Sequence, residues 1–195
     1  MSLEEKVEFE QKEEAKRIYK KFIKATKSKE ILIVILKAHL YMEQELIRAL
    51  TDTLLDEKIL SGTTFRQKLD LAHSIGIIDD IYGALGKVNS IRNSYAHSIE
   101  YSFDEKVFED LLSTLTKSDK DDFLSDYEEM KPIFFYGDIP ELNFKLQVLL
   151  GNIWFALLSC RVFAKRGIEL RMQEKEIQTK SKYISCERSS GNESL

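Results

Sequence analysis

The chain has 195 residues, and its content of 43% hydrophobic and 32% charged residues is that of an ordinary one-domain globular protein. A formal net charge of −4 at pH 7 excludes a polycation, so any binding of nucleic acid requires a local basic patch. Only two prolines and eight glycines interrupt the chain, which favours long helices over a many-stranded β fold.

The N-terminus, the apolar runs and the cysteines predict a cytoplasmic location without a membrane partner. The first residues are acidic and lack an apolar core, so they do not resemble a signal peptide. The longest apolar runs, 31–36 and 148–160, are shorter than the roughly 18 residues that indicate a membrane span. Cys160 and Cys186 lie far apart, with no spacing typical of a zinc site or a disulfide framework.

Residues 2–27 are predicted to form an amphipathic helix that opens with a capping box between Ser2 and Glu5. Between residues 16 and 29 the helix carries seven bases and no acid, with two aromatic residues interleaved. This pattern fits a phosphate-binding stripe, or a solvated face whose aromatic residues pack inward. The bases that are candidates for RNA contact are Lys16, Arg17, Lys20, Lys21 and Lys24.

Two more helices are expected over residues 29–57 and from Thr64, which forms a capping box with Gln67, to about Ile75. In the first of them Glu43 takes a position on the apolar stripe where a hydrophobic residue is expected. The other members of this stripe are Leu36, Leu40, Ile47, Leu50 and Leu54.

A fourth helix is predicted from about Ile78 to His97, and Arg92 falls on its apolar stripe. An unpaired guanidinium on a core-facing stripe costs several kcal/mol, so we expect Arg92 to pair with Glu43. Alternatively, Glu43 accepts hydrogen bonds from the backbone N–H groups of the turn at Arg92–His97. Arg92 and His97 are about 140° apart on an ideal helix. They can act together only if the helix ends near Tyr95 and turns His97 back, or if a second subunit supplies one of them.

The rest of the chain is predicted to be helical with one irregular segment. Ser102 and Glu105 open a helix to about Leu115, and the acidic run 118–129 is a solvated helix or turn. An irregular aromatic segment at 131–139 leads to a last helix from Pro140 to about Glu176. The expected fold is therefore an all-α bundle of five or six helices, with one domain over 1–178 and a polar, disordered tail over 179–195.

No metal or cofactor site is predicted. His39 and Glu43 are one helical turn apart and could be read as two metal ligands, but the sequence offers no third ligand beside them. A histidine on an apolar helix is more often a packed residue of the core.

The segment Ile91–His97 (Ile-Arg-Asn-Ser-Tyr-Ala-His) follows the apolar and acidic helix that contains Ala38–Leu46, with Phe65–Gly76 between them. This order resembles the HEPN superfamily, and within it the branch similar to the mannitol-operon repressor. The arginine and histidine at this spacing are the signature of the superfamily, and Ser102–Asp104 also resembles that branch. The resemblance covers about residues 28–115.

The resemblance implies a helical bundle that forms a homodimer, with the two motifs facing each other. Many members are metal-independent endoribonucleases of toxin or defence type, and in this sequence Arg92, Asn93 and His97 match their catalytic motif, with Glu43 and Tyr95 as supporting residues. Repressor-like members imply instead a non-catalytic transcriptional regulator or adaptor. The partners implied by these two interpretations are RNA and a neutralising or regulatory protein. Without the resemblance, we would interpret Asn93 and His97 as capping the C-terminal end of the helix by bonding its free carbonyl groups.

Overall fold

The computed structural model describes residues 3–53, 57–135 and 137–190, and all regular structure in these ranges is helical. The all-α prediction is confirmed, but the expected five or six helices are too few. The described ranges contain seven α-helices and one short 3-10 helix, η1. They are α1 (Leu3–Thr26), α2 (Ile31–Thr51), η1 (Glu57–Leu60), α3 (Phe65–Ser74), α4 (Tyr82–His97), α5 (Glu105–Leu112), α6 (Lys117–Phe134) and α7 (Glu141–Ser190).

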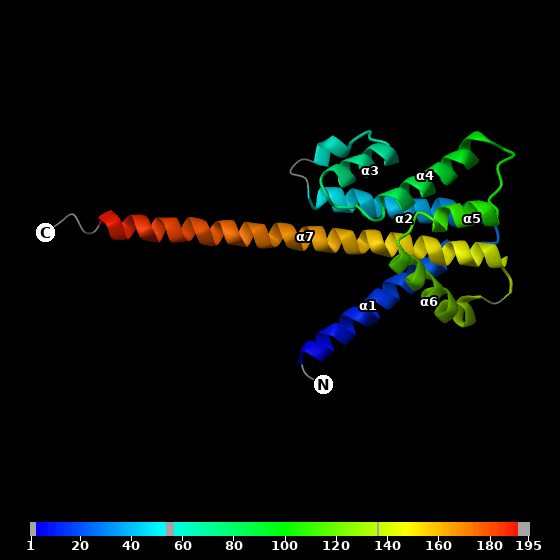
Figure 1. Ribbon diagram of the computed structural model, residues 1–195, viewed down its shortest axis with the longest axis horizontal. Helices are drawn as coiled ribbons and strands as arrows, with labels where there is room; N and C mark the ends of the chain where they lie inside the picture. The colour runs from blue at the N-terminus through cyan, green and yellow to red at the C-terminus, as the bar shows by residue number, and fades with distance from the viewer. Residues whose placement is uncertain (1–2, 54–56, 136, 191–195) are drawn as a thin grey trace.

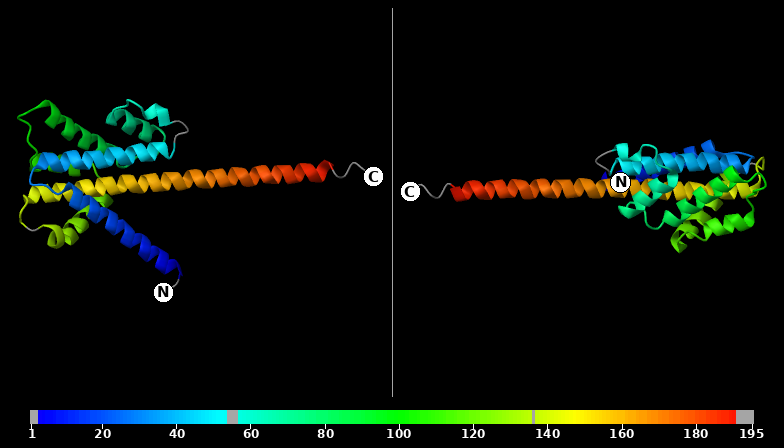
Figure 2. Two further views of the ribbon diagram at one scale, coloured as in Figure 1. Left: turned by 180° about the vertical axis from the view of Figure 1, so that it is seen from behind. Right: turned by 90° about the horizontal axis from the view of Figure 1, so that it is seen from above.

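The long helix α7 is the axis of the molecule. Its first half lies beside α2, with which it forms the most extensive helix pair, and it also contacts α1, α5 and α6. Figure 1 shows α1 and α6 on one side of α7, and α3 and α4 on the other. The second half of α7 extends past the other helices in all three views (Figures 1 and 2).

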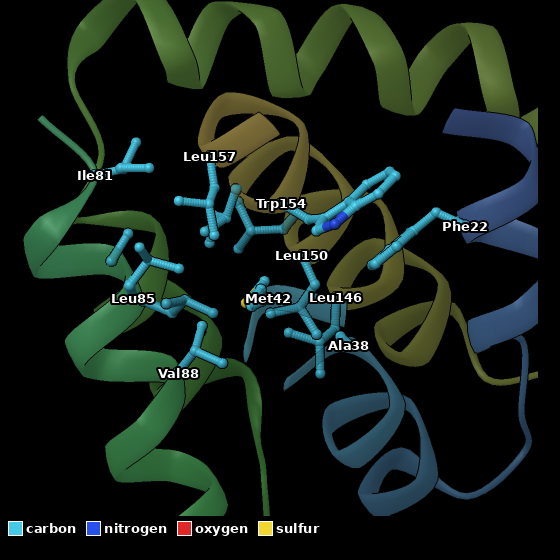
Figure 3. Packing of buried hydrophobic residues seen from close by; sticks show 14 of the residues in the cluster. Phe22, Ala38, Met42, Ile81, Leu85, Val88, Leu146, Leu150, Trp154 and Leu157 are labelled. Carbon is cyan, nitrogen blue, oxygen red and sulfur yellow. The ribbon is translucent and has the colours of Figure 1, made fainter. Parts of the chain in front are cut away.

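The hydrophobic core lies where α1, α2, α4 and α7 meet. Figure 3 shows Met42 of α2 and Leu85 of α4 pointing toward the Leu150 side of α7. Trp154 is buried and stacks on Phe22 of α1 with 4.9 Å between ring centroids. These contacts fix α2 and α4 relative to each other, and so they fix the position of the segment at the end of α4.

Several helix ends differ from the prediction. The capping box of Thr64 and Gln67 is confirmed at the start of α3. The cap of α5 is Asp104, whose side chain accepts from the Val107 N–H, and not Ser102 as expected. The predicted cap at Ser2 lies outside the described residues.

The acidic run after Leu115 forms one continuous helix, α6, which extends to Phe134 and so into the first part of the segment expected to be irregular. Thr116 and Asp119 form a capping box at its start. Its buried face carries Phe123, Tyr127 and Met130, which recur at helical spacing between the acidic residues. This helix accounts for part of the difference from the expected helix count.

Helix α7 continues to Ser190 and so includes residues 179–190 of the predicted tail. The stretch after Gly167 has no glycine or proline and is rich in Glu, Gln, Lys and Arg, all good helix formers, before its serine-rich end. Residues 191–195 lie outside the described ranges.

Among the described residues one stretch, Glu141–Gly167 of α7, is long and apolar enough to cross a membrane by length and composition. Half of its most apolar window is buried within the molecule. Since α7 is the central helix of the bundle, packing against α2 accounts for its apolar character.

Candidate functional site

The candidate site lies on the C-terminal half of α4. Ala84, Leu85, Val88 and Ile91 are buried and hold the helix against the core. The helix is intact through His97 and ends because Ser98 adopts an extended conformation. The backbone N–H of Phe103 donates to the hydroxyl of Tyr95 at 3.0 Å, so Tyr95 holds the chain that follows the helix.

Arg92 lies at the border of the buried face of α4, where Ile91 takes the core position. Its Nη1 donates to Oδ1 of the neighbouring Asn93 at 3.1 Å, and both side chains are partly exposed. No carboxylate among the described residues lies within ion-pair distance of Arg92. The guanidinium is therefore partly accessible and is not neutralised by any carboxylate that the structure describes.

The expected pairing of Glu43 with Arg92 is wrong, because Glu43 binds Lys68 of α3. Lys68 Nζ lies 3.0 Å from Glu43 Oε1, and it also donates to the carbonyl of Thr63 at 2.8 Å. Lys68 is buried, so this ion pair ties α3 to α2. Periodicity placed Glu43 near the core but could not identify which helix supplies its counter-charge.

His39 of α2 contacts α4 and is close enough to Glu43 and Arg92 to feel the charge of both. The ring is buried and lies tilted against that of Phe65, with 4.4 Å between ring centroids. Its Nε2 lies 3.3 Å from Asn89 Oδ1 on α4. Burial lowers the pKa of His39, while Asn89 and Glu43 oppose this shift and the positive charges of Arg92 and Lys68 add to it. The structure thus gathers His39, Glu43, Lys68, Asn89 and Arg92 between α2, α3 and α4. Sequence reasoning missed Lys68 and Asn89, although Asn89 lies one helical turn before Asn93.

His97 is the last residue of α4 and is exposed. Because the helix continues to His97, the turn that would fold this residue back toward Arg92 is absent. On a continuous helix the two side chains leave the axis about 140° apart. One copy of the chain therefore does not direct Arg92 and His97 at the same point, and the remaining alternative for joint action is a second subunit.

Leu36, Leu40 and Ile47, three members of the stripe predicted on α2, are not buried in the core as expected but form a partly exposed apolar face together with Ile33. Ile33 and Leu40 are 38% and 58% exposed, although both are large and hydrophobic, and Leu36 and Ile47 are partly buried. These four residues fall within about 60° of one another on the helix. His39, which faces Asn89 of α4, is about 60–120° away from these residues around α2, so the exposed apolar face lies to one side of the face of α2 that contacts α4. We call these four residues the α2 stripe.

The bases of α1 lie apart from this site. Tyr19 and Phe22 are buried, so the aromatic residues pack inward and leave a solvated basic face. Lys16 and Arg17 are near Glu13 and Glu14, with Arg17 held at 2.7 Å. Figure 1 shows α1 on the other side of α7 from α4, so Lys20, Lys21 and Lys24 are not brought to Arg92.

The chain matches no family model, no curated protein and no solved structure. The resemblance to the HEPN superfamily therefore rests on the motif and the helices that precede it.

No group of three or more His, Cys, Asp and Glu residues close enough to hold a metal ion occurs in the described part of the chain. Near the site, His39 faces Asn89 and Glu43 binds Lys68, so these two residues do not converge as ligands. The groups that are available for chemistry are a guanidinium, an amide and an imidazole.

Proposed function

We propose that the protein is a dimeric, metal-independent endoribonuclease of toxin or defence type that uses Arg92, Asn93 and His97. The observation that carries the proposal is that Arg92 and His97 both remain accessible on one helix and that neither is bound to a carboxylate of the described residues.

These three groups match the chemistry of RNA cleavage. RNA supplies its own nucleophile, the 2′-hydroxyl, and an imidazole is a common general base near neutral pH. Attack of the 2′-oxygen on phosphorus breaks the bond to the 5′-oxygen and leaves a 2′,3′-cyclic phosphate. The guanidinium of Arg92 would stabilise charge on the phosphorane-like transition state, and Asn93, bound to Arg92, would orient it.

The α2 stripe supports a dimer as the active form. Apolar residues as exposed as Leu40 are costly to leave in water when they line one helix face. We propose that a second copy packs on this stripe in an arrangement in which the two α4 segments face each other. Arg92 of one protomer and His97 of its partner could then reach one phosphate, which a single chain does not allow.

The test is cleavage of a mixed RNA panel in the presence of EDTA by purified wild type, His97→Ala and His73→Ala. We expect wild type and His73→Ala to cleave, because His73 is an exposed histidine on α3 that takes no part in the site. We expect His97→Ala to be slower by about a hundredfold or more, the usual loss of a general base. An inert wild type, or a His97→Ala variant as fast as wild type, would refute the proposal.

The alternative is a non-catalytic regulator or adaptor resembling the mannitol-operon repressor. It is favoured by the bond from Phe103 to Tyr95, which gives this segment a structural role at the end of α4. In that case Arg92→Ala would change the melting temperature or partner binding while RNA remains intact in every sample. Both functions place the protein in the cytoplasm, where RNA and a neutralising or regulatory protein partner are present.

A further inference from the structure

A cavity of about 520 Å³ opens between α6 and α7, away from the α4 site. Its floor is apolar and is formed by Ile81, Leu115 and Ile153, all buried, together with Ala156 of α7. Phe163 lies at its edge and is 72% exposed. The volume is within the range of small-molecule sites, and the apolar floor would bury the hydrophobic part of a ligand.

The charged groups around this cavity have a single sign. Asp80, Asp119, Asp122 and Asp126 line it, and no lysine or arginine lines it among the described residues. Asp119 is occupied in the capping box of α6, where its carboxylate accepts from the backbone N–H and the hydroxyl of Thr116, the N-cap residue. Asp80, Asp122 and Asp126 have no ion-pair partner within the described ranges, although ion pairs are common elsewhere in this structure.

Asp126 is the most informative of these carboxylates. It is partly buried beside Asn152, and burial raises its pKa, as do Glu129 and Asp122, while the hydrogen bond from Asn152 lowers it. Asn152 in turn accepts from the hydroxyl of Tyr19 at 2.5 Å, which fixes this wall of the cavity. A partly buried carboxylate that lacks a counter-ion is stabilised when a cation binds near it.

We propose that this cavity binds a small organic cation that has an apolar body, of the arylalkylammonium class. The apolar body would lie on Ile153 and Ala156, and the ammonium group would face Asp122 and Asp126. Aromatic side chains such as Phe155 and Phe163 add a favourable cation–π surface. The site is separate from Arg92 and His97 and does not depend on RNA cleavage.

The experiment is calorimetric titration of the full chain with phenethylammonium, and with neutral 2-phenylethanol as a probe of the same shape. We expect saturable binding of the cation at one site, and weaker binding of the alcohol by about three- to tenfold or more. The preference should shrink at high salt, because the interaction is between charges near the surface.

Two pairs of variants locate the site. Asp122→Asn should weaken binding of the cation about three- to tenfold, whereas Asp121→Asn, an exposed neighbour that does not line the cavity, should leave it unchanged. Ala156→Phe should fill the floor and abolish binding of both probes. Phe163→Ala, at an exposed position that is tolerant of change, should weaken binding of both without unfolding the chain.

Three outcomes would overturn the proposal. They are the absence of saturable binding at millimolar phenethylammonium, equal affinity for the cation and the alcohol, and equal effects of Asp122→Asn and Asp121→Asn. If Ala156→Phe does not fold, Phe163→Ala decides the location, and an affinity equal to that of wild type would place the binding elsewhere.

Discussion

His39 is a buried residue whose protonation is linked to folding. In the unfolded chain a histidine has its ordinary pKa of 6.5, whereas burial in the folded chain lowers the pKa of His39. The folded state therefore binds its proton only at lower pH than the unfolded state does. The contribution of neutral His39 to the free energy of unfolding is therefore fully present above pH 6.5. It is lost as the pH falls toward the lowered pKa that His39 has in the folded state.

The prediction is that His39→Gln reduces the loss of stability between pH 8 and pH 5.5. Glutamine can keep a hydrogen bond to Asn89 but cannot be protonated. The measurement is the free energy of unfolding in urea at both pH values for wild type and variant. Equal pH dependence in the two proteins would show that His39 is not a source of this acid sensitivity.

At the level of single residues, the sequence predicted the environment of a side chain better than it predicted the residue that the side chain contacts. Arg92 was expected on an apolar stripe and lies at the border of one, and Glu43 was expected to need a cation and has one. That cation is Lys68, because the contact depends on how α3 packs across α2. Periodicity along one helix carries no information on the placement of another helix.

Helix α6 shows why one helical pattern that is present in the sequence was not recognised. Phe123, Tyr127 and Met130 have helical spacing, but the surrounding aspartates and glutamates suggested a solvated segment. Its capping box uses Asp119 in the position where glutamate or glutamine is usual, so the start signal was missed as well. The apolar face of α6 is what buries it against α7.

The pair of α2 and α7 contains a buried ion pair that sequence reasoning did not find. Glu45 is 1% exposed, and its Oε1 lies 2.7 Å from Arg161 Nε at angles outside those of a hydrogen bond. Arg48 reaches the other oxygen of Glu45 at 3.3 Å from an exposed position. The carboxylate is thus held mainly by Coulomb attraction to two arginines, of which Arg161 is the more buried.

We predict that Arg161→Ala lowers the free energy of unfolding by about 3 kcal/mol, because it leaves a buried carboxylate without its main counter-charge. The matched variant Arg48→Ala removes the exposed arginine from the same carboxylate and should cost less than about 1 kcal/mol. Urea unfolding of both variants measures the difference. Equal losses would mean that the two arginines contribute alike.

For the whole molecule, the α2 stripe predicts self-association. Leu40→Glu should weaken a homodimer at least tenfold, since it places a charge in an apolar interface. Leu124→Glu is the control, because Leu124 of α6 is 56% exposed, close to the 58% of Leu40, but lies on another helix. Sedimentation velocity across a concentration series gives the dissociation constants. A wild type that is monomeric at all concentrations, or equal effects of both variants, would contradict this dimer.

The fold class of the whole molecule could be predicted from composition, because few helix breakers and repeated 3.6-residue periodicity leave little room for strands. The continuation of α7 beyond the bundle could not be predicted from composition. A polar, serine-containing end resembles a disordered tail in composition, and the preference of its Glu, Gln, Lys and Arg residues for helix is weak at each position.

The central position of α7 also determines when the protein can fold. The hydroxyl of Tyr19 in α1 donates to the carbonyl of Val148, 129 residues later, and Gln147 donates to Ile23 across 124 residues. On the ribosome the first six helices are therefore synthesised before the helix that completes their core. Contacts of such sequence separation slow folding relative to bundles of neighbouring helices. During that interval the apolar faces of α1 and α2 lack their main partner, so a nascent chain is the form in which this protein most needs a chaperone.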